Sequence, residues 1–403
     1  MNDSPRLRVT HDGFLGLFAL DAEIGWQKLH VTLKRTFELA VGAPMQLTTR
    51  QYALCTRDHP FEDADPLSSA MGVAMRFESD IGPVKAKTDV VVHAQCYAPG
   101  GESTACQASV QVANEDPVTV KVVGDRVAVV VGEQVRFTGA KPFIVRPIRY
   151  EFAYGGVDKS TLPYVAEGAP GGYFCETNPV GTGYMVDLGD ENPPGARWTS
   201  LPNIEHPDRP LLPESFLCAT GATPEERPPA GFGWIPRTWK QRIQNNGFPE
   251  GMNSFWNLVF PGKKSVAGIS KDRELAFWNG APEALQVELE GFEKIVLTNL
   301  HHKHRELKLV LPILQPRLSV TVGEEKAVKL RPTLVTVQIE VERNEAILAW
   351  RATVERPEAE VEPETPPAVV ITVDDLPLPP AHEMLDYPTK APQIYQVPAP
   401  DEG

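Results

Sequence analysis

The sequence has no surplus of basic residues. Its 403 residues include 39 lysines and arginines against 53 aspartates and glutamates, which gives a formal net charge of −14. A protein that binds nucleic acid needs clustered positive charge to neutralise phosphates. Anionic membrane surfaces likewise attract basic segments. The charge balance therefore argues against both kinds of partner.

Long apolar runs and cysteines are also scarce. No segment approaches the roughly 20 apolar residues of a membrane-spanning helix, and the N-terminal stretch MNDSPRLRVTHDG lacks the apolar core of a secretory signal. The five cysteines are odd in number and lack the spacing of metal ligands: Cys55, Cys96, Cys106, Cys175 and Cys218. We therefore expect free, mostly buried thiols in a reducing compartment, and predict a cytoplasmic protein.

Proline, by contrast, is abundant. The chain has 39 prolines, which is about twice the usual usage, so long helices should be few. Apolar and β-branched residues alternate with polar ones between Gly, Pro and Asn, which is typical of antiparallel strands. The predicted strand segments are Lys28–Leu39, Thr88–Ala98, Ala108–Asn114, Val118–Gly132, Ala284–His301, Leu307–Leu314 and Thr333–Glu355.

Two of these segments have the pattern of a β-hairpin. Val118–Gly132 carries Gly124-Asp125 at its centre, a dipeptide favoured in tight turns. Thr333–Glu355 has a polar turn ERNEA between two apolar halves. In its first half the polar residues alternate with apolar ones up to Glu342, so they should face opposite sides of the sheet.

The predicted fold is mainly β, with antiparallel sheets in sandwich- or barrel-like packing and few short helices. Residues 1–150 and 263–355 supply the strands of a single unit, residues 1–355. Residues 151–262 form a loop-rich insert with many turn-forming dipeptides, and so long an irregular segment often carries function. Inside it, Ile235–Gly247 predicts a short helix that ends at Asn246-Gly247, and Gly251–Phe260 would continue it.

The stretch RPIRYEFAYGGVDKS (Arg146–Ser160) leads into this insert. Three apolar or aromatic residues at period two predict a strand: Ile148, Tyr150 and Phe152. The strand should end at Gly155-Gly156, where glycine permits a positive φ beside bulky aromatic residues. Three charged residues are expected in ion pairs or as loop anchors: Arg146, Arg149 and Glu151.

The composition changes after Arg356. Residues 356–403 are acidic and proline-rich, so we predict an extended tail that packs no core of its own. Two apolar islands in it are typical of a segment that docks on another surface, either on its own body or on a partner; the alternative is a solvated tail. The predicted docking residues are Val369, Val370, Ile371, Val373, Leu376, Leu378, Met384, Leu385 and Tyr387.

Candidates for chemistry are few. The histidine cluster HHKH (His301–His304) falls short of a zinc site, which needs three or four ligands and usually includes partners far along the chain, so we expect an exposed turn. Glu78 and Asp80 offer the paired carboxylates of glycoside hydrolases, but nearby Lys85 and Lys87 favour structural ion pairs. No phosphate-binding loop and no Gly-x-Ser-x-Gly nucleophile motif has the required spacing.

Aromatic residues gather in Gly231–Trp239, in Trp278–Gly280 and in the sequence FWNLVF. With Arg237 and Arg242 nearby, these residues are candidates for a binding surface, because aromatic and arginine side chains are enriched at interfaces. The alternative is a core that supports the long loops. The sequence leaves both interpretations open.

Several blocks, in this order and spacing, resemble the motifs of one bacterial family. They are RFESDIGPVKAKTDVVVHAQCYAPGG (residues 76–101), VKVVGDR (120–126), RPIRYEFAYGGVD (146–158), NPVGTGY (178–184), LPNIE (201–205), PAGFGWIPRTWKQR (229–242), NLHHKHRELKLVLP (299–312) and PTLVTVQIEVERNEAILAWRATV (332–354). The family is a bacterial domain of unknown function found in type VI secretion loci, whose members serve as adaptor chaperones for effectors with PAAR-like tips. The resemblance covers about residues 10–355 and departs at Tyr154 and Ala94.

The resemblance implies a non-enzymatic adaptor in the bacterial cytoplasm. It would bind a PAAR-like effector and promote its loading onto the VgrG spike, with no catalytic residue, cofactor or metal. The expected partner-binding residues are Tyr154, Gly155, Gly156, Asn178, Pro179, Tyr184, Asn203, Phe232, Trp234, Arg237 and Trp239. Two alternatives remain: a carbohydrate or metal-dependent hydrolase that uses Glu78, Asp80 or the histidine cluster, and a structural component of the secretion apparatus.

Overall fold

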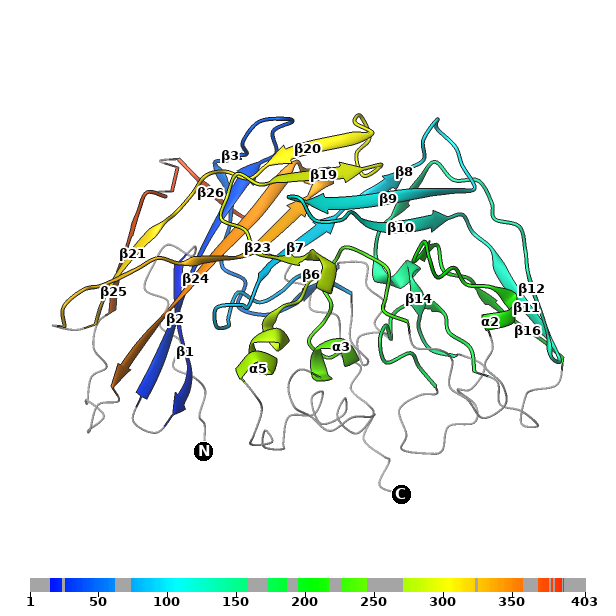
Figure 1. The fold of residues 1–403 in the computed structure, drawn as a ribbon, viewed down its shortest axis with the longest axis horizontal. Coiled ribbons are helices and arrows are strands. Elements are labelled where there is room, and N and C mark those ends of the chain that lie inside the picture. Colours follow the sequence, from blue (N-terminus) through cyan, green and yellow to red (C-terminus); the bar gives the residue numbers. More distant parts are fainter. Residues whose placement is uncertain are drawn as a thin grey trace, which may run out of the picture.

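The computed structural model shows a mainly β protein with a few short helices (Figure 1). It describes residues 15–23, 26–61, 74–158, 173–186, 195–216, 227–244, 271–322, 325–357, 369–376, 378–379, 381–385 and 387. The predicted fold class is confirmed as mainly β with several antiparallel sheets. No described sheet closes into a barrel.

The largest sheet has seven strands. Its order is β1 (Leu15–Glu23), β2 (Trp26–Glu38), β24 (Glu345–Pro357), β23 (Thr333–Glu340), β7 (Thr88–His93) and β18 (Gln286–Val287), and β3 (Gln46–Leu47) pairs with β2. All neighbours are antiparallel except β23 and β7. The predicted hairpin over Thr333–Glu355 is confirmed, and its turn is the short 3-10 helix η6 (Val341–Arg343).

A five-stranded antiparallel sheet packs against the seven-stranded one. Its order is β17 (Ile204–Glu205), β10 (Val118–Val123), β9 (Ala105–Val112), β19 (Lys294–Thr298) and β20 (Glu306–Val310). Buried side chains of both sheets, such as Val31, Val337, Val110 and Leu297, belong to one hydrophobic cluster. Two sheets that share a core in this way form a sandwich.

Smaller sheets flank the sandwich at opposite ends (Figure 1). One contains β12 (Gln134–Phe137), β11 (Val127–Val131) and β16 (Ala196–Ser200), and the other contains β22 (Val328–Leu330), β21 (Arg317–Val322) and β25 (Val369–Asp374). Four strand pairs complete the set: β13 (Val145–Pro147) with β8 (Gln95–Tyr97), β14 (Tyr154–Gly155) with β15 (Thr182–Gly183), β26 (Glu383–Leu385) with β4 (Arg50–Tyr52), and β5 (His59–Pro60) with β6 (Met75–Phe77).

The described helices are short. They are α2 (Pro213–Phe216), α3 (Lys240–Ile243), α5 (Lys271–Trp278) and the 3-10 turns η1 (Tyr150–Phe152) and η5 (Glu283–Leu285). The longest, α5, has eight residues, so no described helix reaches the length of a membrane span. Within the described residues 235–244, the helix predicted over Ile235–Gly247 is limited to α3, and residues 245–247 and Gly251–Phe260 lie outside the described residues.

The hairpin predicted over Val118–Gly132 is wrong. β10 belongs to the five-stranded sheet and β11 to the β12–β11–β16 sheet, so Gly124-Asp125 carries the chain from one sheet to the other. The backbone of Lys141 packs so closely there that a Cβ on Gly124 would lie 1.7 Å from the Lys141 carbonyl oxygen. Glycine is therefore required by close packing at this crossover rather than by a tight turn.

The strand predicted through Phe152 is also wrong, because Tyr150–Phe152 turn as η1. The turn places the Tyr150 ring against Trp239, with ring centroids 5.3 Å apart, and lets its hydroxyl donate to the Gly233 carbonyl at 2.9 Å. The predicted ion pairs are present: Arg146 with Asp125 at 2.7 Å, and Arg149 with Glu151. Gly155 and Gly156 have φ of +150° and +96°, as expected.

Candidate functional site

The second face of the seven-stranded sheet is polar and buried. Alternation along the strands turns one set of side chains into the sandwich core and the other set away from it. The outer set includes Lys34, Asp89, Thr336, Gln338, Glu340 and Arg351, each no more than 9% exposed. Because segments from elsewhere in the chain cover this face, its charged groups must find partners inside the protein.

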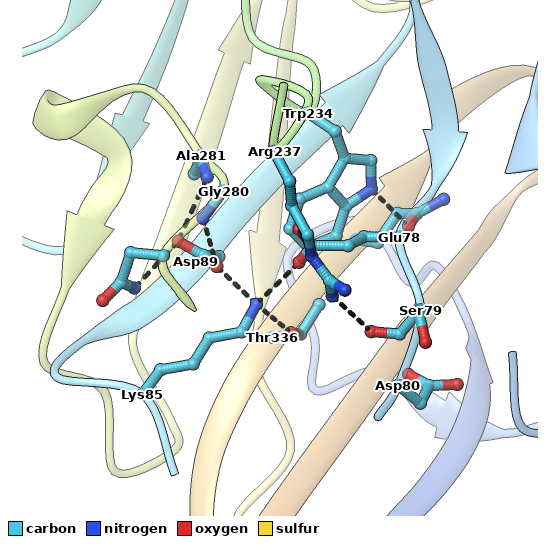
Figure 2. A network of polar contacts seen from close by, with 12 residues as sticks. Glu78, Ser79, Asp80, Lys85, Asp89, Trp234, Arg237, Gly280, Ala281 and Thr336 are labelled. Atoms are coloured by element: carbon cyan, nitrogen blue, oxygen red, sulfur yellow. Dashed lines mark hydrogen bonds and ion pairs between the residues drawn. The ribbon is translucent and has the colours of Figure 1, made fainter. Parts of the chain in front are cut away.

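Lys85 is the hub of the polar network on this face (Figure 2). Its Nζ lies 2.5 Å from Asp89 Oδ2, 3.3 Å from Glu78 Oε2 and 3.5 Å from Thr336 Oγ1. The same ammonium group lies 4.9 Å from the centroid of the Trp234 ring, a cation–π distance. A lysine buried to 1% exposure therefore has its charge balanced from several sides.

Glu78 gathers three cations. Its Oε1 accepts hydrogen bonds from Arg242 and from Arg237 (Nε at 3.3 Å), while Lys85 approaches Oε2. Burial alone would raise the pKa of Glu78, but the charges of Arg242, Lys85 and Arg237 outweigh it and hold the pKa well below its usual range. Glu78 is thus an ionised carboxylate, whereas a glycosidase general acid needs a raised pKa.

Asp89 joins the sheet to the segment after α5. Its carboxylate accepts hydrogen bonds from the backbone N–H groups of Gly280 (2.9 Å) and Ala281 (3.1 Å) and from Asn279 Nδ2 (3.0 Å) (Figure 2). Backbone N–H groups buried at this depth need an acceptor. The Trp278–Gly280 motif therefore serves as an anchor point on β7.

Asp80 and Glu340 complete the network on either side. Asp80 Oδ2 accepts from Lys34 Nζ at 2.7 Å and from the Cys55 backbone N–H at 2.6 Å. Glu340 lies 2.7 Å from His93 Nδ1 and 2.8 Å from Arg76 Nη2. Burial opposes ionisation of Glu340, but His93 and Arg76 outweigh it and lower its pKa to about 2.

The space within the network is too small for a substrate. The cavity bordered by Glu78, Asp80, Lys85 and Arg351 has a volume of about 10 Å³, which is at the lower limit for one water molecule. Every carboxylate described above is engaged by cations or N–H donors. The arrangement therefore suits the fastening of covering segments to the sheet.

The histidine cluster forms the turn between β19 and β20. His301 Nδ1 accepts hydrogen bonds from the backbone N–H groups of Lys303 (3.1 Å) and His304 (3.2 Å), and its ring stacks on His302 at 4.6 Å. The expected polar turn is thus observed. Within the described part of the chain, no three His, Cys, Asp or Glu side chains gather as a metal site would require.

Most of the residues expected to bind a partner lie inside the protein. Phe232, Trp234 and Trp239 are at most 3% exposed, and Asn178 is fully buried. Gly155, Gly156, Pro179 and Tyr184 are also buried; Tyr154, Asn203 and Arg237 are half-buried. The aromatic residues of Gly231–Trp239 therefore form a core that supports the loops, which is the second of the two interpretations given above.

Asn178, in the NPVGTGY motif, makes its contacts inside the protein. Its Nδ2 donates to the carbonyl oxygens of Tyr150 (2.9 Å) and Tyr154 (3.0 Å). The backbone carbonyl oxygen of Asn178 lies so close to Gly155 that a Cβ added to Gly155 would be 2.2 Å from it. The NPVGTGY and AYGG motifs therefore pack against each other and fix the backbone where the loop region begins.

The tail residues lie on the body of the same chain. β25 pairs with β21 along its whole length, and Ile371 and Leu376 are 3% exposed. β26 pairs with β4, and Tyr387 packs with Tyr52 and Phe77. The remaining members are more peripheral: Val370 and Met384 are 52% exposed, Val373, Leu378 and Leu385 are half-buried, and the Val369 backbone pairs with Val322.

Tyr387 connects the tail to the polar network. Its hydroxyl lies 2.5 Å from Lys34 Nζ and donates to the Ala53 carbonyl at 2.8 Å. Burial and the nearby carboxylate of Asp80 raise the pKa of Tyr387, so this hydroxyl stays protonated. The tail therefore contributes the Tyr387 hydroxyl to the interior, in addition to the Leu376 carbonyl that accepts from the buried Arg35 at 3.1 Å.

Among the described residues, two surface features are candidates for contact with a partner. A groove of about 250 Å³ is lined by Tyr154, Ile204, Leu211 and Ala230 with Arg209 and Arg227 among its polar residues. Its volume is below the roughly 300–1,000 Å³ of small-molecule sites. On the β12–β11–β16 sheet, Trp198 is 71% exposed.

Part of the network was predicted from the sequence. Glu78 and Asp80 were expected in structural ion pairs with nearby lysines, and the polar face of β23 was expected from its pattern, but Asp89, His93 and Arg351 were not singled out. The available signal was a charged residue inside an otherwise apolar strand pattern, as in TDVVVH and ILAWRATV. Such residues are rarely buried unless paired, so their presence there indicates buried partners.

A protein-family model described as "Uncharacterized protein conserved in bacteria (DUF2169)" matches residues 25–351. The match covers the polar network, the loop region and the sandwich except for β1 and the end of β24, and it ends before the tail residues. No curated protein and no solved structure matches the chain.

Proposed function

The chain belongs to the bacterial DUF2169 family, and on that premise we propose that it is a non-enzymatic adaptor of type VI secretion. It binds a PAAR-like effector in the cytoplasm and promotes loading of that effector onto the VgrG spike. The proposal starts from the resemblance of the ordered sequence blocks to adaptor chaperones found in type VI secretion loci.

The placement of those blocks supports a binding scaffold. The block of residues 76–101 supplies Glu78, Asp80, Lys85 and Asp89, and the block of residues 229–242 supplies Arg237 and Arg242. These charged groups pair with one another around a cavity of about 10 Å³. Motif residues that bind each other fix a rigid body, and a rigid body limits the entropy lost on binding a partner.

The observation that carries the proposal is an exposed tryptophan beside valines on the outer face of the β12–β11–β16 sheet, which Gln134 and Arg136 border. Trp198 lies directly opposite Val129, and Val127 and Val131 share that face because they are two residues away along β11. Trp198 and Val131 are 71% and 56% exposed. An exposed tryptophan in an apolar patch marks a protein interface more often than a small-molecule site.

Co-expression tests the proposal. The full chain is produced with the PAAR-like proteins encoded in the same genome, and the complexes are separated by affinity capture and size exclusion. We expect a PAAR-like protein or VgrG to remain bound to the chain. Recovery of neither protein, under conditions in which both are soluble, contradicts the proposal. Retention of the chain in assembled secretion particles favours a structural component instead.

Trp198 gives the sharper version of this test. The exchange Trp198→Ser should weaken effector binding by roughly tenfold or more, since buried tryptophans at interfaces are frequent hot spots. The matched control is Ile313→Ser, which removes a 62% exposed apolar side chain from a different surface. Equal binding by both variants excludes the Trp198 face as the interface.

A further inference from the structure

Two thiols lie in contact between the β8 and β9 strands. Cys96 Sγ is 3.4 Å from Cys106 Sγ. Cys96 is fully buried, whereas Cys106 is partly exposed at the start of β9. Both cysteines are free. The pair therefore combines a fully buried residue with a partly exposed one.

One asparagine bridges the backbones next to the two cysteines, which also pair with β13 and β10. The Asn299 carbonyl accepts from the Tyr97 N–H at 2.9 Å, and Asn299 Nδ2 donates to the Gln107 carbonyl at 2.8 Å. Tyr97 and Gln107 each adjoin one cysteine. Residue 299 thus fixes the separation of the two strands at the position where the thiols meet.

The two sulfur atoms lie close to the separation of a disulfide bond. A disulfide needs a sulfur separation of about 2.05 Å, so the sulfurs must approach by roughly 1.4 Å. The connecting loop already turns through Gly100 and Gly101, whose φ values are +80° and +99°, so the loop is compatible with a cross-link between its two ends.

The pKa values of the two thiols are shifted in opposite directions. The contact between the two sulfurs lowers the pKa of Cys106, and the same contact together with burial raises the pKa of Cys96. The thiolate is the nucleophile in thiol–disulfide exchange. Cys106 is the more exposed of the two residues, so it is the sulfur that meets a small disulfide first, and its lowered pKa acts in the same direction.

Two other described cysteines have different surroundings. Cys55 Sγ donates to the Arg57 carbonyl at 2.8 Å, and burial raises the pKa of Cys55 to about 12. Cys175 Sγ lies 3.2 Å from Thr177 Oγ1. These thiols contact oxygen atoms, which makes them internal controls for the reactivity of the Cys96–Cys106 pair.

We propose that Cys96 and Cys106 are a reversible dithiol–disulfide site that reacts with a low-molecular-weight disulfide of the glutathione class. The Cys106 thiolate attacks one sulfur of the small disulfide, forms a mixed disulfide and releases one small thiolate. The Cys96 thiolate then attacks the Cys106 sulfur and releases the second small thiol. The two protein thiols are oxidised by two electrons, and the small disulfide is reduced to two thiols.

The bond would join β8 to β9 covalently. Through the β8–β13 pairing it would also fasten Val145–Pro147, the strand that leads into the loop region. The site goes beyond the proposed adaptor function and does not depend on it. Its failure would leave the adaptor proposal untouched, because the tests share no readout.

The experiment exposes the purified full chain to graded ratios of oxidised to reduced glutathione. Free thiols are then alkylated under denaturing conditions, and intact mass and peptide maps are recorded. We expect two of the five cysteines to lose their thiols together, with one linked peptide pair containing Cys96 and Cys106. The thiols should return on addition of dithiothreitol.

Single variants test the order of the steps. Cys96→Ser should trap glutathione on Cys106, and Cys106→Ser should leave Cys96 unmodified. Cys55→Ser is the matched control and should form the cross-link like the unmodified chain. Circular dichroism checks the fold of each variant, and Cys106→Ala replaces Cys106→Ser if the latter unfolds.

Three results overturn the proposal. In the first, both thiols remain open to alkylation at the most oxidising ratio. In the second, the linked peptides contain another pair of cysteines. In the third, the unmodified chain stops at a glutathione adduct on Cys106, which means that Cys96 does not reach the mixed disulfide.

Discussion

Lys85 Nζ lies 2.5 Å from Asp89 Oδ2, and both side chains are at most 1% exposed. The pair connects the segment before β7 to the strand itself, and Asp89 in turn accepts the N–H groups of Gly280 and Ala281. A buried ion pair that also satisfies backbone donors is costly to break, because each group left behind keeps its charge or its unmet hydrogen bond.

Asp89→Ala should therefore lower the free energy of unfolding by about 3–5 kcal/mol, the range for removal of one partner of a buried pair. Urea unfolding followed by circular dichroism measures the change. The matched control is Glu306→Ala, which breaks a Lys308–Glu306 pair whose side chains are 63% and 57% exposed. Surface pairs contribute about 0–1 kcal/mol, so a similar loss in both variants would contradict the assigned role of Asp89.

This network also shows what the sequence did and did not predict. The alternation of polar and apolar residues in β23 is local, so the two faces of that strand were predicted from the pattern alone. The burial of the polar face was not, because the segments that cover it, such as Trp234 and Gly280, lie far away in the sequence. Pattern reasoning treats such a face as solvated.

The glycines of Gly155-Gly156 and Gly124-Asp125 also show which structural features can be predicted from the sequence and which cannot. The positive φ at Gly155 and Gly156 followed from their aromatic neighbours and was predicted correctly. At Gly124-Asp125 the turn preference of the dipeptide predicted a hairpin, whereas the structure requires glycine for the close approach of Lys141. A close approach, by the Asn178 carbonyl, also acts at Gly155, and such contacts are tertiary and leave no local signal in the sequence.

Stability should fall as the pH falls from about 4.5 towards 2. The pKa of Glu340 is lowered to about 2 and that of Glu78 is lowered further below its usual range. In this window the unfolded chain binds more protons than the folded chain, so the free energy of unfolding rises with pH. Urea unfolding at intervals between pH 2.5 and 6, values chosen to bracket the ordinary glutamate pKa of about 4.3, measures this slope.

Glu340→Gln identifies the source of that pH dependence. The amide cannot ionise, so the variant should have a shallower pH dependence below about pH 4.5, together with a lower stability at neutral pH. Glu306→Gln, at an exposed position, is the control and should retain the original slope. An unchanged slope in Glu340→Gln would show that other carboxylates govern acid unfolding.

Tyr387 should anchor the tail. Tyr387→Ala removes a 9% exposed ring from the cluster with Tyr52 and Phe77, and loss of such a ring costs about 3–5 kcal/mol in a core. We expect faster amide exchange in β25 and β26 and earlier protease cleavage of the tail. Met384→Ala, at a 52% exposed position, should change neither. If exchange in β26 is as slow in Tyr387→Ala as in the parent, the anchor lies elsewhere.

Gly155→Ala should disrupt the entry to the loop region. The new Cβ would lie 2.2 Å from the Asn178 carbonyl oxygen, at a φ of +150°, so both the contact and the backbone conformation oppose it. We expect a loss of more than about 3 kcal/mol, which exceeds the usual range for point mutants, or failure to fold. Gly139→Ala, where no atom lies within 4 Å of the added Cβ, is the matched control and should have little effect. Thermal unfolding distinguishes the two variants, and equal melting temperatures would show that the Asn178 loop moves aside readily.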